Sequence, residues 1–322
     1  MDALIHTTAG PEVGYGHVVR CAHLANELSR RGVRVYAWPY RPTAAAGYLR
    51  SRAGALIMGP ECAEIGVLDT MTYDARIVEE LRASVDKLVV IVGAGYRLTP
   101  ELLRAADLLV FQTGWVVGQH GWTSGGGDPV FNDEVTFKPP QISGPDFIIL
   151  GPEYARPLNV MRQREALVVF GSGIPWDYTV ETTQALSDRG VRGTLVVPPH
   201  YAGEYEYTLS PHGFTMLNSP LTLRGLQAMH TVQVGSLGMS TYEALAAGCW
   251  PVTVGKTADH VETADILMTM GMGWGMGNWE QAGPVDIAST AATYLATVIE
   301  FPRVIDGYGV GRVVERILEG LA

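Results

Sequence analysis

The segment GYGHVVRCAHLANEL, from Gly14 to Leu28, decides how the chain is interpreted. It follows a short apolar run over residues 3–5 and joins two glycines and a histidine to apolar residues at helical spacing. Gly14 and Gly16 tolerate a left-handed backbone and let a ligand approach the main chain closely. The helix start behind them offers unpaired N–H groups and a partial positive charge. The pattern therefore predicts a strand, a ligand-binding turn and a helix, with His17 at the junction.

A second turn of this kind lies in VGSLGMSTYEALAAGCWP, residues 234–251. Gly238, Ser240 and Thr241 are small residues at a helix start, which suits a diphosphate, and Glu243 is placed to accept hydrogen bonds from a ribose diol. The same spacing fits a capping box with Ser240 as N-cap and Glu243 three residues on. Both interpretations stay open. One such turn in each half predicts a single ligand held between two domains.

Between and after these turns, strand-like and helical segments alternate, and then the alternation restarts. This order indicates an α/β protein with two doubly wound parallel sheets, covering about residues 1–155 and 156–300 and facing a cleft. We expect strands at 33–38, 65–69, 87–93, 107–113, 166–173, 193–199, 230–236 and 250–255, and a last strand with an irregular linker over 147–160. We expect helices at 77–84, 100–106, 178–188, 241–248 and 261–271.

Further candidate residues follow two of the expected strands. Gly171, Ser172 and Gly173 end the strand 166–173, where their amides could face a phosphate, although the same residues fit a tight turn before a helix opened by Pro175. Asp259 and His260 follow the strand 250–255 and could face a sugar, although Asp259 fits a helix cap equally well.

His17 is the candidate for chemistry. A neutral imidazole at the carboxyl end of the first strand could accept a proton from a water or a hydroxyl group as a general base. The alternative is a capping or packed ring at the helix start. Residues 114–146 lack any clear periodicity, so they form a plain loop, a functional loop or a small hairpin.

Composition excludes several classes of protein. The chain has 322 residues, of which 47% are hydrophobic and 17% charged, and a net charge of −10 that disfavours a nucleic-acid groove. Its three cysteines form no CxxC, which is typical of a reduced, cytoplasmic protein. The sequence has no signal-peptide pattern and no apolar run long enough for a membrane span. No DxD occurs, so we expect neither a metal-bridged diphosphate nor another cofactor.

Taken together, the motifs resemble a known family. GYGHVVRCAHLANELSRRG is similar to the opening GxGHxxRxxxLAxxL of the nucleotide-sugar hydrolases of pseudaminic acid biosynthesis, which belong to the wider GT-B group with the lipid II N-acetylglucosaminyltransferase. Similar stretches follow in the same order along nearly the whole chain. They are IILGPEYARPLNVMRQREALVVFGSG, VGSLGMSTYEALAAGCWPVTV and IDGYGVGRVVERIL.

The resemblance implies a GT-B fold, His17 as the catalytic base, and uridine diphosphate contacts at Gly238, Ser240, Thr241 and Glu243. It also implies that a last helix, within 301–322, crosses back onto the first domain. The sugar-specific positions depart from the family: a Gly-Gly-Ser-Asp turn becomes Gly171 to Ile174, and an Asn-Gln pair becomes Asp259-His260.

We therefore expect a metal-independent glycosyltransferase that uses a nucleotide sugar as its small-molecule partner. The departures suggest that the nucleotide is retained while the sugar, or the reaction, has changed. The alternatives are a hydrolase of the pseudaminic type and a non-catalytic nucleotide-sugar-binding protein. The acceptor is a hydroxyl group of unknown type. A modified DNA base stays possible as acceptor because several arginines lie in the less acidic first half, although a solvated helix end explains them better.

Overall fold

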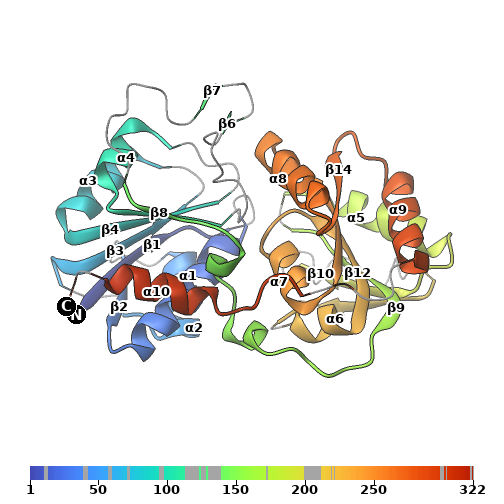
Figure 1. Ribbon diagram of the computed structural model, residues 1–322, viewed down its shortest axis with the longest axis horizontal. Coiled ribbons are helices and arrows are strands. Elements are labelled where there is room, and N and C mark those ends of the chain that lie inside the picture. The colour runs from blue at the N-terminus through green and yellow to red at the C-terminus, as the bar shows by residue number, and fades with distance from the viewer. Residues whose placement is uncertain are drawn as a thin grey trace. The chain divides into compact units, whose positions relative to one another are not determined.

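The structure is a computed structural model, and every structural statement below refers to the residues that it describes. These residues are 1–10, 14–38, 43–56, 60–70, 73–93, 98–112, 123–124, 128–129, 139–171, 173–198, 212–218, 220, 222–297, 301, 303–319 and 321. The chain forms two compact units. Unit 1 comprises Met1–Pro152 and Gly307–Ala322, and unit 2 comprises Glu153–Asp306 (Figure 1).

Unit 1 is built on a parallel sheet with the strand order β2-β1-β3-β4-β5-β8. Its strands are β1 (Asp2–Thr7), β2 (Arg34–Ala37), β3 (Ala63–Asp69), β4 (Val85–Val92), β5 (Leu108–Phe111) and β8 (Gln141–Ile142). Its helices are α1 (Gly16–Arg30), α2 (Ala44–Ala53), α3 (Ala75–Ala83), α4 (Pro100–Ala105) and α10 (Gly309–Leu318). A separate pair, β6 (Thr123–Ser124) and β7 (Asp128–Pro129), is antiparallel.

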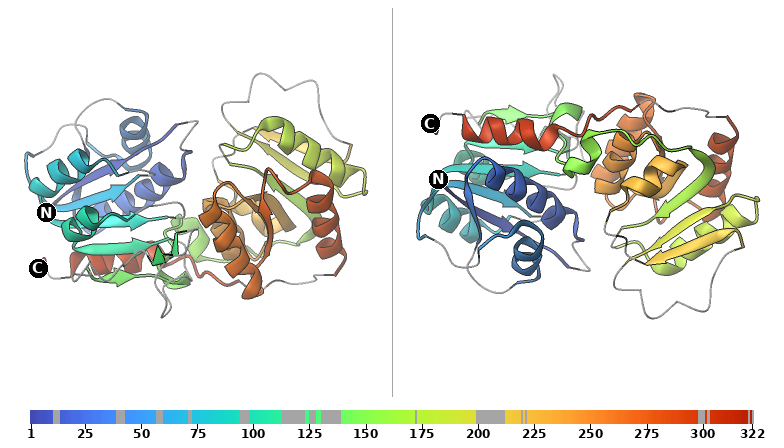
Figure 2. Two further views of the ribbon diagram at one scale, coloured as in Figure 1. Left: turned by 90° about the horizontal axis from the view of Figure 1, so that it is seen from above. Right: turned by 90° about the horizontal axis from the view of Figure 1, so that it is seen from below.

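Alternation along the strands divides the core of unit 1 between the two faces of the sheet. Ala3 and Ile5 join a buried cluster with residues of α1, α2 and α10. Leu4, between them, joins a second cluster with residues of α3 and α4. Helices therefore cover both faces of the sheet, as Figure 2 shows from above and below. Such a sheet is buried on both sides, which explains its nearly continuous apolar strands.

Unit 2 repeats this plan with the strand order β11-β10-β9-β12-β13-β14, again parallel throughout. Its strands are β9 (Gln163–Val169), β10 (Gly193–Val197), β11 (Phe214–Asn218), β12 (His230–Ser236), β13 (Trp250–Gly255) and β14 (Trp274–Asn278). Its helices are α5 (Trp176–Ser187), α6 (Arg224–Met229), α7 (Met239–Ala247), α8 (Ala258–Thr269) and α9 (Pro284–Thr297). The expected fold class, α/β with two doubly wound parallel sheets, is thus confirmed.

One expected strand is absent. Residues 148–150, in the segment predicted as a last strand, pair with no other strand and lie between 3-10 turns at Pro145–Phe147 and Pro152–Ala155. The reason is that the side chain of Gln112 takes the place of a neighbouring strand. Its amide nitrogen donates to the Phe147 carbonyl at 3.0 Å, and its amide oxygen accepts from the Ile149 N–H at 2.8 Å. Most of the 114–146 segment lies outside the described residues.

Helix α10 begins directly against this segment. A Cβ built on Gly309 would overlap the carbonyl oxygen of Ile148 and lie 2.8 Å from the carbonyl carbon. The buried face of α10, with Val310, Val313 and Val314, belongs to the same hydrophobic cluster as the buried residues of α1. At the other end of α10, the Lys87 ammonium donates to the carbonyls of residues 316, 317 and 319, where the helix dipole is negative.

Two glycines of α10 give a matched test of this packing. Gly309→Ala should destabilise the protein by about 1–3 kcal/mol, because the new methyl group meets backbone that cannot move aside easily. Gly311→Ala should be neutral or stabilising by about 0.5–1 kcal/mol, because only Glu27 Oε1 lies near, at 3.9 Å, and alanine favours the helix. Urea unfolding of both variants measures the difference, and equal stability would show that the start of α10 is not in close contact.

Candidate functional site

The sheet order of unit 1 places a topological switch point between β1 and β3. The chain leaves β1 toward β2 on one side, while β4 lies beyond β3 on the other. Ligands of doubly wound sheets bind at such a switch point, outside the carboxyl ends of the strands. Here β1 ends at Thr7 and β3 ends at Asp69, and these two residues are partners in the strand register. The first candidate site of the chain lies at this end of unit 1.

The turn before α1 brings His17 to the same end. Gly14 has φ +84° and pairs with Gly10, because its N–H donates to the Gly10 carbonyl at 2.7 Å and its carbonyl accepts from the Gly10 N–H at 3.3 Å. Gly16 begins α1, so His17 is the second residue of the helix, and its side chain is 13% exposed. It does not cap the helix, because no side chain caps this start.

His17 forms a hydrogen-bonded chain with Asp69 and Arg20. Its Nδ1 lies 3.0 Å from Asp69 Oδ1. Arg20, one turn further along α1, donates through Nε to Asp69 Oδ2 at 2.9 Å and through its terminal nitrogen to Oδ1 at 2.6 Å. The carboxylate of Asp69 is fully buried and Arg20 is nearly so. This fork is the bidentate geometry that a guanidinium offers a carboxylate.

The charge state of Asp69 follows from these contacts. Burial alone would raise the pKa of its carboxyl group, but the positive charge of Arg20 and the hydrogen bonds from His17 and Arg20 outweigh burial, so the pKa is lowered. Asp69 is therefore ionised at neutral pH. Nearby, burial and the charge of Asp69 raise the pKa of the Cys21 thiol well above its usual value, so that cysteine stays protonated.

The ionised carboxylate fixes the tautomer of His17. A carboxylate only accepts hydrogen bonds, so Nδ1 must carry the proton in its bond to Asp69. Nε2 then keeps its lone pair on a partly exposed ring. An imidazole held in this way can accept a proton at Nε2, and Asp69 can stabilise the imidazolium that results. Arg20 and Asp69 were not singled out from the sequence, although the aspartate at the end of an expected strand was a usable signal.

Unit 2 has a matching switch point between β9 and β12. The chain turns from β9 to β10 and from β12 to β13, in opposite directions. The turns after the two strands are joined, because the Gly171 N–H donates to Ser236 Oγ at 2.9 Å. A Cβ on Gly235 would overlap the Val169 carbonyl, so only glycine fits there. Gly173 has φ +89°, and Ser172, the remaining residue of this predicted site, lies outside the described residues.

The start of α7 differs from the predicted capping box. Gly238, rather than Ser240, is the N-cap, and Met239 begins the helix. The Gly238 N–H donates to Thr241 Oγ1 at 3.3 Å, so Thr241 closes the turn with its side chain and is itself fully buried. Glu243, the proposed partner in the box, is one residue beyond the first turn. Its spacing from Gly238 is too long for capping, which leaves its carboxylate available for other contacts.

A buried amide network, not foreseen from the sequence, holds this helix start. Gln227 Nε2 and Gln233 Nε2 donate to the Ser240 carbonyl at 3.1 and 3.0 Å. Gln227 also donates to Gln233 Oε1 and accepts from the Tyr154 hydroxyl, both at 2.8 Å. Both glutamines are at most 1% exposed. Buried polar groups are stable only when hydrogen-bonded, so this network fixes the position of the first turn of α7.

Glu243 is half-buried beside a second acid. Burial and the negative charge of Glu153 raise the pKa of the Glu243 carboxyl group to about 7. It makes no hydrogen bond or ion pair with the described residues. A carboxylate in such a position can accept hydrogen bonds from a bound ligand, and its charge depends on pH near neutrality.

A lysine and a histidine complete this end of unit 2. Lys256 follows β13, and a Cβ on Gly173 would overlap its ammonium nitrogen, so the lysine lies over the glycine turn. It forms no ion pair with a described acid. His260, in the first turn of α8, has a buried Nδ1 without a hydrogen-bond partner in the described chain. Burial, helped by the charge of Lys256, lowers the pKa of His260 to about 4.

Asp259 lies beside His260 but is not the helix cap that the sequence also allowed. Thr257 is the N-cap of α8 and accepts from the His260 N–H at 3.4 Å. Within the described residues, no group of histidines, cysteines and acids is arranged to hold a metal ion. In the same part of the chain, every helix is too short or too polar to cross a membrane.

Comparison with known proteins identifies the fold. No protein-family model matches the sequence, and no curated protein matches it. Three similar solved structures are each 12% identical in sequence to this chain. The spinosyn rhamnosyltransferase SpnG has a TM-score of 0.62 over 99% of this chain and 96% of that one. MurG of Acinetobacter baumannii has a TM-score of 0.58 over 99% of this chain and 99% of that one. Phytolacca americana UGT2, complexed with UDP-2-fluoro-glucose and pterostilbene, has a TM-score of 0.54 over 99% of this chain and 93% of that one.

SpnG has also been solved with thymidine diphosphate, with a TM-score of 0.61, 12% identity, and coverage of 98% of this chain and 96% of that one. These neighbours are GT-B glycosyltransferases, and the chain shares their fold. Nothing in the comparisons supports the narrower resemblance to the pseudaminic hydrolases.

Asp69→Asn tests the buried network. At pH 7 it should lower the free energy of unfolding by about 3–5 kcal/mol, because Arg20 loses its buried counter-charge. Since folding lowers the pKa of Asp69, its stabilisation is complete above the ordinary value of 3.8 and is lost as pH falls through the lower pKa of the folded state. The deficit of the variant should therefore shrink below about pH 3.8. The exposed Asp86→Asn serves as control, and an equal, pH-independent effect of both changes would contradict the network.

Proposed function

We propose that the protein is a metal-independent glycosyltransferase that transfers a sugar from a uridine diphosphate sugar to a hydroxyl acceptor. The observation that carries this proposal is the His17–Asp69 pair at the switch point of a GT-B unit. Two further points support it. The second unit presents glycine turns and a helix start at its own switch point, and similar folds have been solved with thymidine diphosphate and with a UDP sugar.

In this proposal, unit 1 activates the acceptor. His17 Nε2 removes the proton from the acceptor hydroxyl, whose oxygen forms a bond to the anomeric carbon of the donor. The bond between that carbon and the diphosphate breaks, and the diphosphate leaves with the bonding electrons. Asp69 stabilises the imidazolium that forms, and Arg20 keeps Asp69 ionised and in place.

Unit 2 binds the donor. The N–H groups at the start of α7, near Gly238 and Ser240, and the glycine turn at 171–173 face the diphosphate. Thr241 contributes through the turn that it holds, and Glu243 accepts hydrogen bonds from the ribose. Asp259 and His260 lie toward the sugar, so the orphaned Nδ1 of His260 would find a hydroxyl partner there.

Departure of the diphosphate requires positive charge near the leaving oxygens. The start of α7 carries the positive end of the helix dipole, and the Lys256 ammonium, which pairs with no described acid, lies over the adjacent glycine turn. These two features are our reason for proposing a metal-independent reaction, although the same groups would also serve hydrolysis, in which water replaces the acceptor.

Incubation with a panel of nucleotide sugars, with and without hydroxyl acceptors and in excess EDTA, tests the assignment. We expect nucleoside diphosphate release that requires an acceptor, is fastest with UDP sugars and is unaffected by the chelator. Release of free sugar without acceptor would instead indicate the hydrolase, and binding without turnover would indicate a sugar-nucleotide-binding protein. A rate lost in EDTA and restored by Mg²⁺ would contradict the metal-independent diphosphate site.

The raised pKa of Glu243 predicts that UDP binds more tightly at pH 8 than at pH 6. The carboxyl group is ionised only above about pH 7, and the carboxylate is the better acceptor for ribose hydroxyls. At pH 8, Glu243→Ala should weaken binding by about 1–3 kcal/mol. Calorimetry with Glu243→Gln should show a flatter pH profile than wild type, since titration of the UDP phosphate is common to both.

Glu153→Gln provides the matched variant. Removing the neighbouring negative charge should lower the pKa of Glu243, so the rise in affinity should occur at a lower pH than in wild type. Identical profiles for wild type and Glu243→Gln would assign Glu243 a purely structural role.

A further inference from the structure

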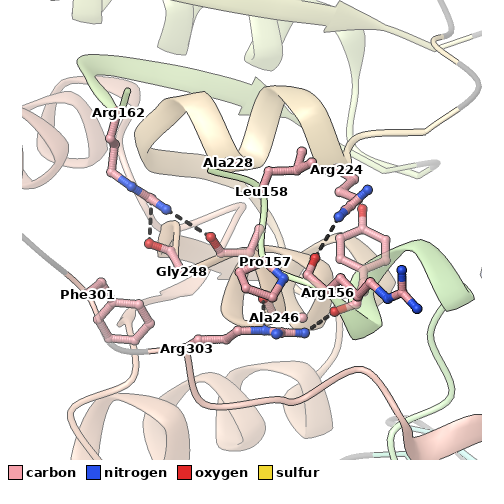
Figure 3. Close-up of a pocket in the computed structure, with 12 residues that line it drawn as sticks. Arg156, Pro157, Leu158, Arg162, Arg224, Ala228, Ala246, Gly248, Phe301 and Arg303 are labelled. Atoms are coloured by element: carbon pink, nitrogen blue, oxygen red, sulfur yellow. Dashed lines mark hydrogen bonds between the residues drawn. The ribbon is translucent and has the colours of Figure 1, made fainter. Parts of the chain in front are cut away.

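Unit 2 contains a cavity of about 180 Å³ that the proposed reaction does not use. It lies at the other end of α7, beside residues 246–248, and the linker 156–158 and Phe301 form further parts of its wall (Figure 3). Four arginines line it, namely Arg156, Arg162, Arg224 and Arg303, and the described lining includes no aspartate or glutamate.

This gathering is unusual for the unit. Residues 153–306 contain only eight lysines and arginines against fifteen acids, yet half of the basic side chains line one cavity. Elsewhere most arginines pair with carboxylates, as Arg20, Arg34 and Arg192 do. By contrast, Arg156, Arg162 and Arg224 form no ion pair with any described acid. Like charges collected in this way repel one another, and an anion bound among them would relieve that repulsion.

Backbone carbonyls hold three of the four guanidinium groups in place, those of Arg162, Arg224 and Arg303. Arg162 donates to the carbonyls of His230 and Ala247, at 3.0 and 2.8 Å, and Arg224 donates to the Arg156 carbonyl at 2.6 Å. Arg303 donates to the carbonyl of Ala246 at 2.7 Å (Figure 3). A guanidinium has five N–H donors, so these bonds leave N–H groups of Arg162 and Arg224 available. Groups already fixed in position lose little entropy when a ligand binds.

We propose that this cavity binds the phosphate group of a small phosphate ester, at a site separate from the donor end of unit 2. A tetrahedral dianion can accept from guanidinium groups on several sides, whereas a planar carboxylate pairs with one or two. Leu158, Ala228 and Phe301 add an apolar wall, which strengthens the charge interactions and suits the organic part of an ester. The site does not depend on the proposed glycosyl transfer.

Inorganic phosphate is the probe, titrated by calorimetry at constant ionic strength. Arg156→Ala removes an exposed side chain that makes no bond to described residues, and Arg224→Gln removes a charge while keeping a donor for the Arg156 carbonyl. Arg189→Ala is the matched control, because that exposed arginine of the same unit also donates to a carbonyl but lies outside the cavity. Lys256→Ala removes the lysine at the proposed donor-binding end of unit 2, so a loss of affinity in this variant would show that phosphate binds there rather than in the cavity.

We expect wild type, Arg189→Ala and Lys256→Ala to bind phosphate equally at the cavity, and the combined Arg156 and Arg224 change to weaken that binding by about tenfold or more. Equal thermal unfolding of the variants without phosphate would show that the fold is intact. The proposal is overturned if wild type binds no phosphate, if the double variant binds it normally, if Lys256→Ala alone abolishes it, or if acetate binds as well as phosphate.

Discussion

The hydrogen bonds around Asp69 are the interaction on which the chemistry of the molecule depends. A carboxylate buried without compensation would be protonated or would destabilise the fold. Here Arg20 supplies the compensating charge from the same helix that carries His17, three residues earlier. One turn of α1 therefore carries both partners of Asp69: Arg20 neutralises the buried carboxylate, and His17 places its imidazole within hydrogen-bond distance of it. The parallel sheet makes this possible, since β1 and β3 end side by side where their connections diverge.

Unit 2 uses the same topology with different chemistry. Its switch point carries glycine turns and a helix start. Among the described residues, Lys256 there pairs with no acid, and a buried nitrogen of His260 has no hydrogen-bond partner. The polar network of Tyr154, Gln227 and Gln233 holds α7 from within. At the opposite end of α7, arginines bind its last carbonyls. The helix is thus held at both ends, which would suit the ligand-binding role that we propose for its first N–H groups.

The fold and the His17 position were predictable because both arise from local patterns. Apolar runs followed by a glycine-containing turn, Gly14–Gly16 or Gly235–Gly238, and then by helical spacing predict strand–turn–helix units. Contacts between distant segments were not predictable in this way. The partnership of Arg20 with Asp69 spans 49 residues, and Gln112 replaces a strand that the apolar run at 148–150 suggested.

Other errors have local causes. The glycines and tryptophan of β14, and the alanines and threonines of α2 and α9, gave no clear period, so these elements were not expected. The helix caps also differed, because Gly238 and Thr257 are the N-caps of α7 and α8 in place of Ser240 and Asp259. Ser, Thr, Asp and Gly all serve as N-caps, and tertiary contacts decide among neighbouring candidates.

The most direct measurement of the central claim is the turnover and donor affinity of His17→Ala, with the exposed His212→Ala as control. If His17 is the general base, kcat should fall roughly 100- to 10,000-fold while UDP affinity stays that of wild type, because donor binding is assigned to unit 2. His212→Ala should behave as wild type in both assays. Near-full turnover in His17→Ala would remove the residue from catalysis, and loss of UDP affinity together with turnover would show that it holds the ligand or the fold instead.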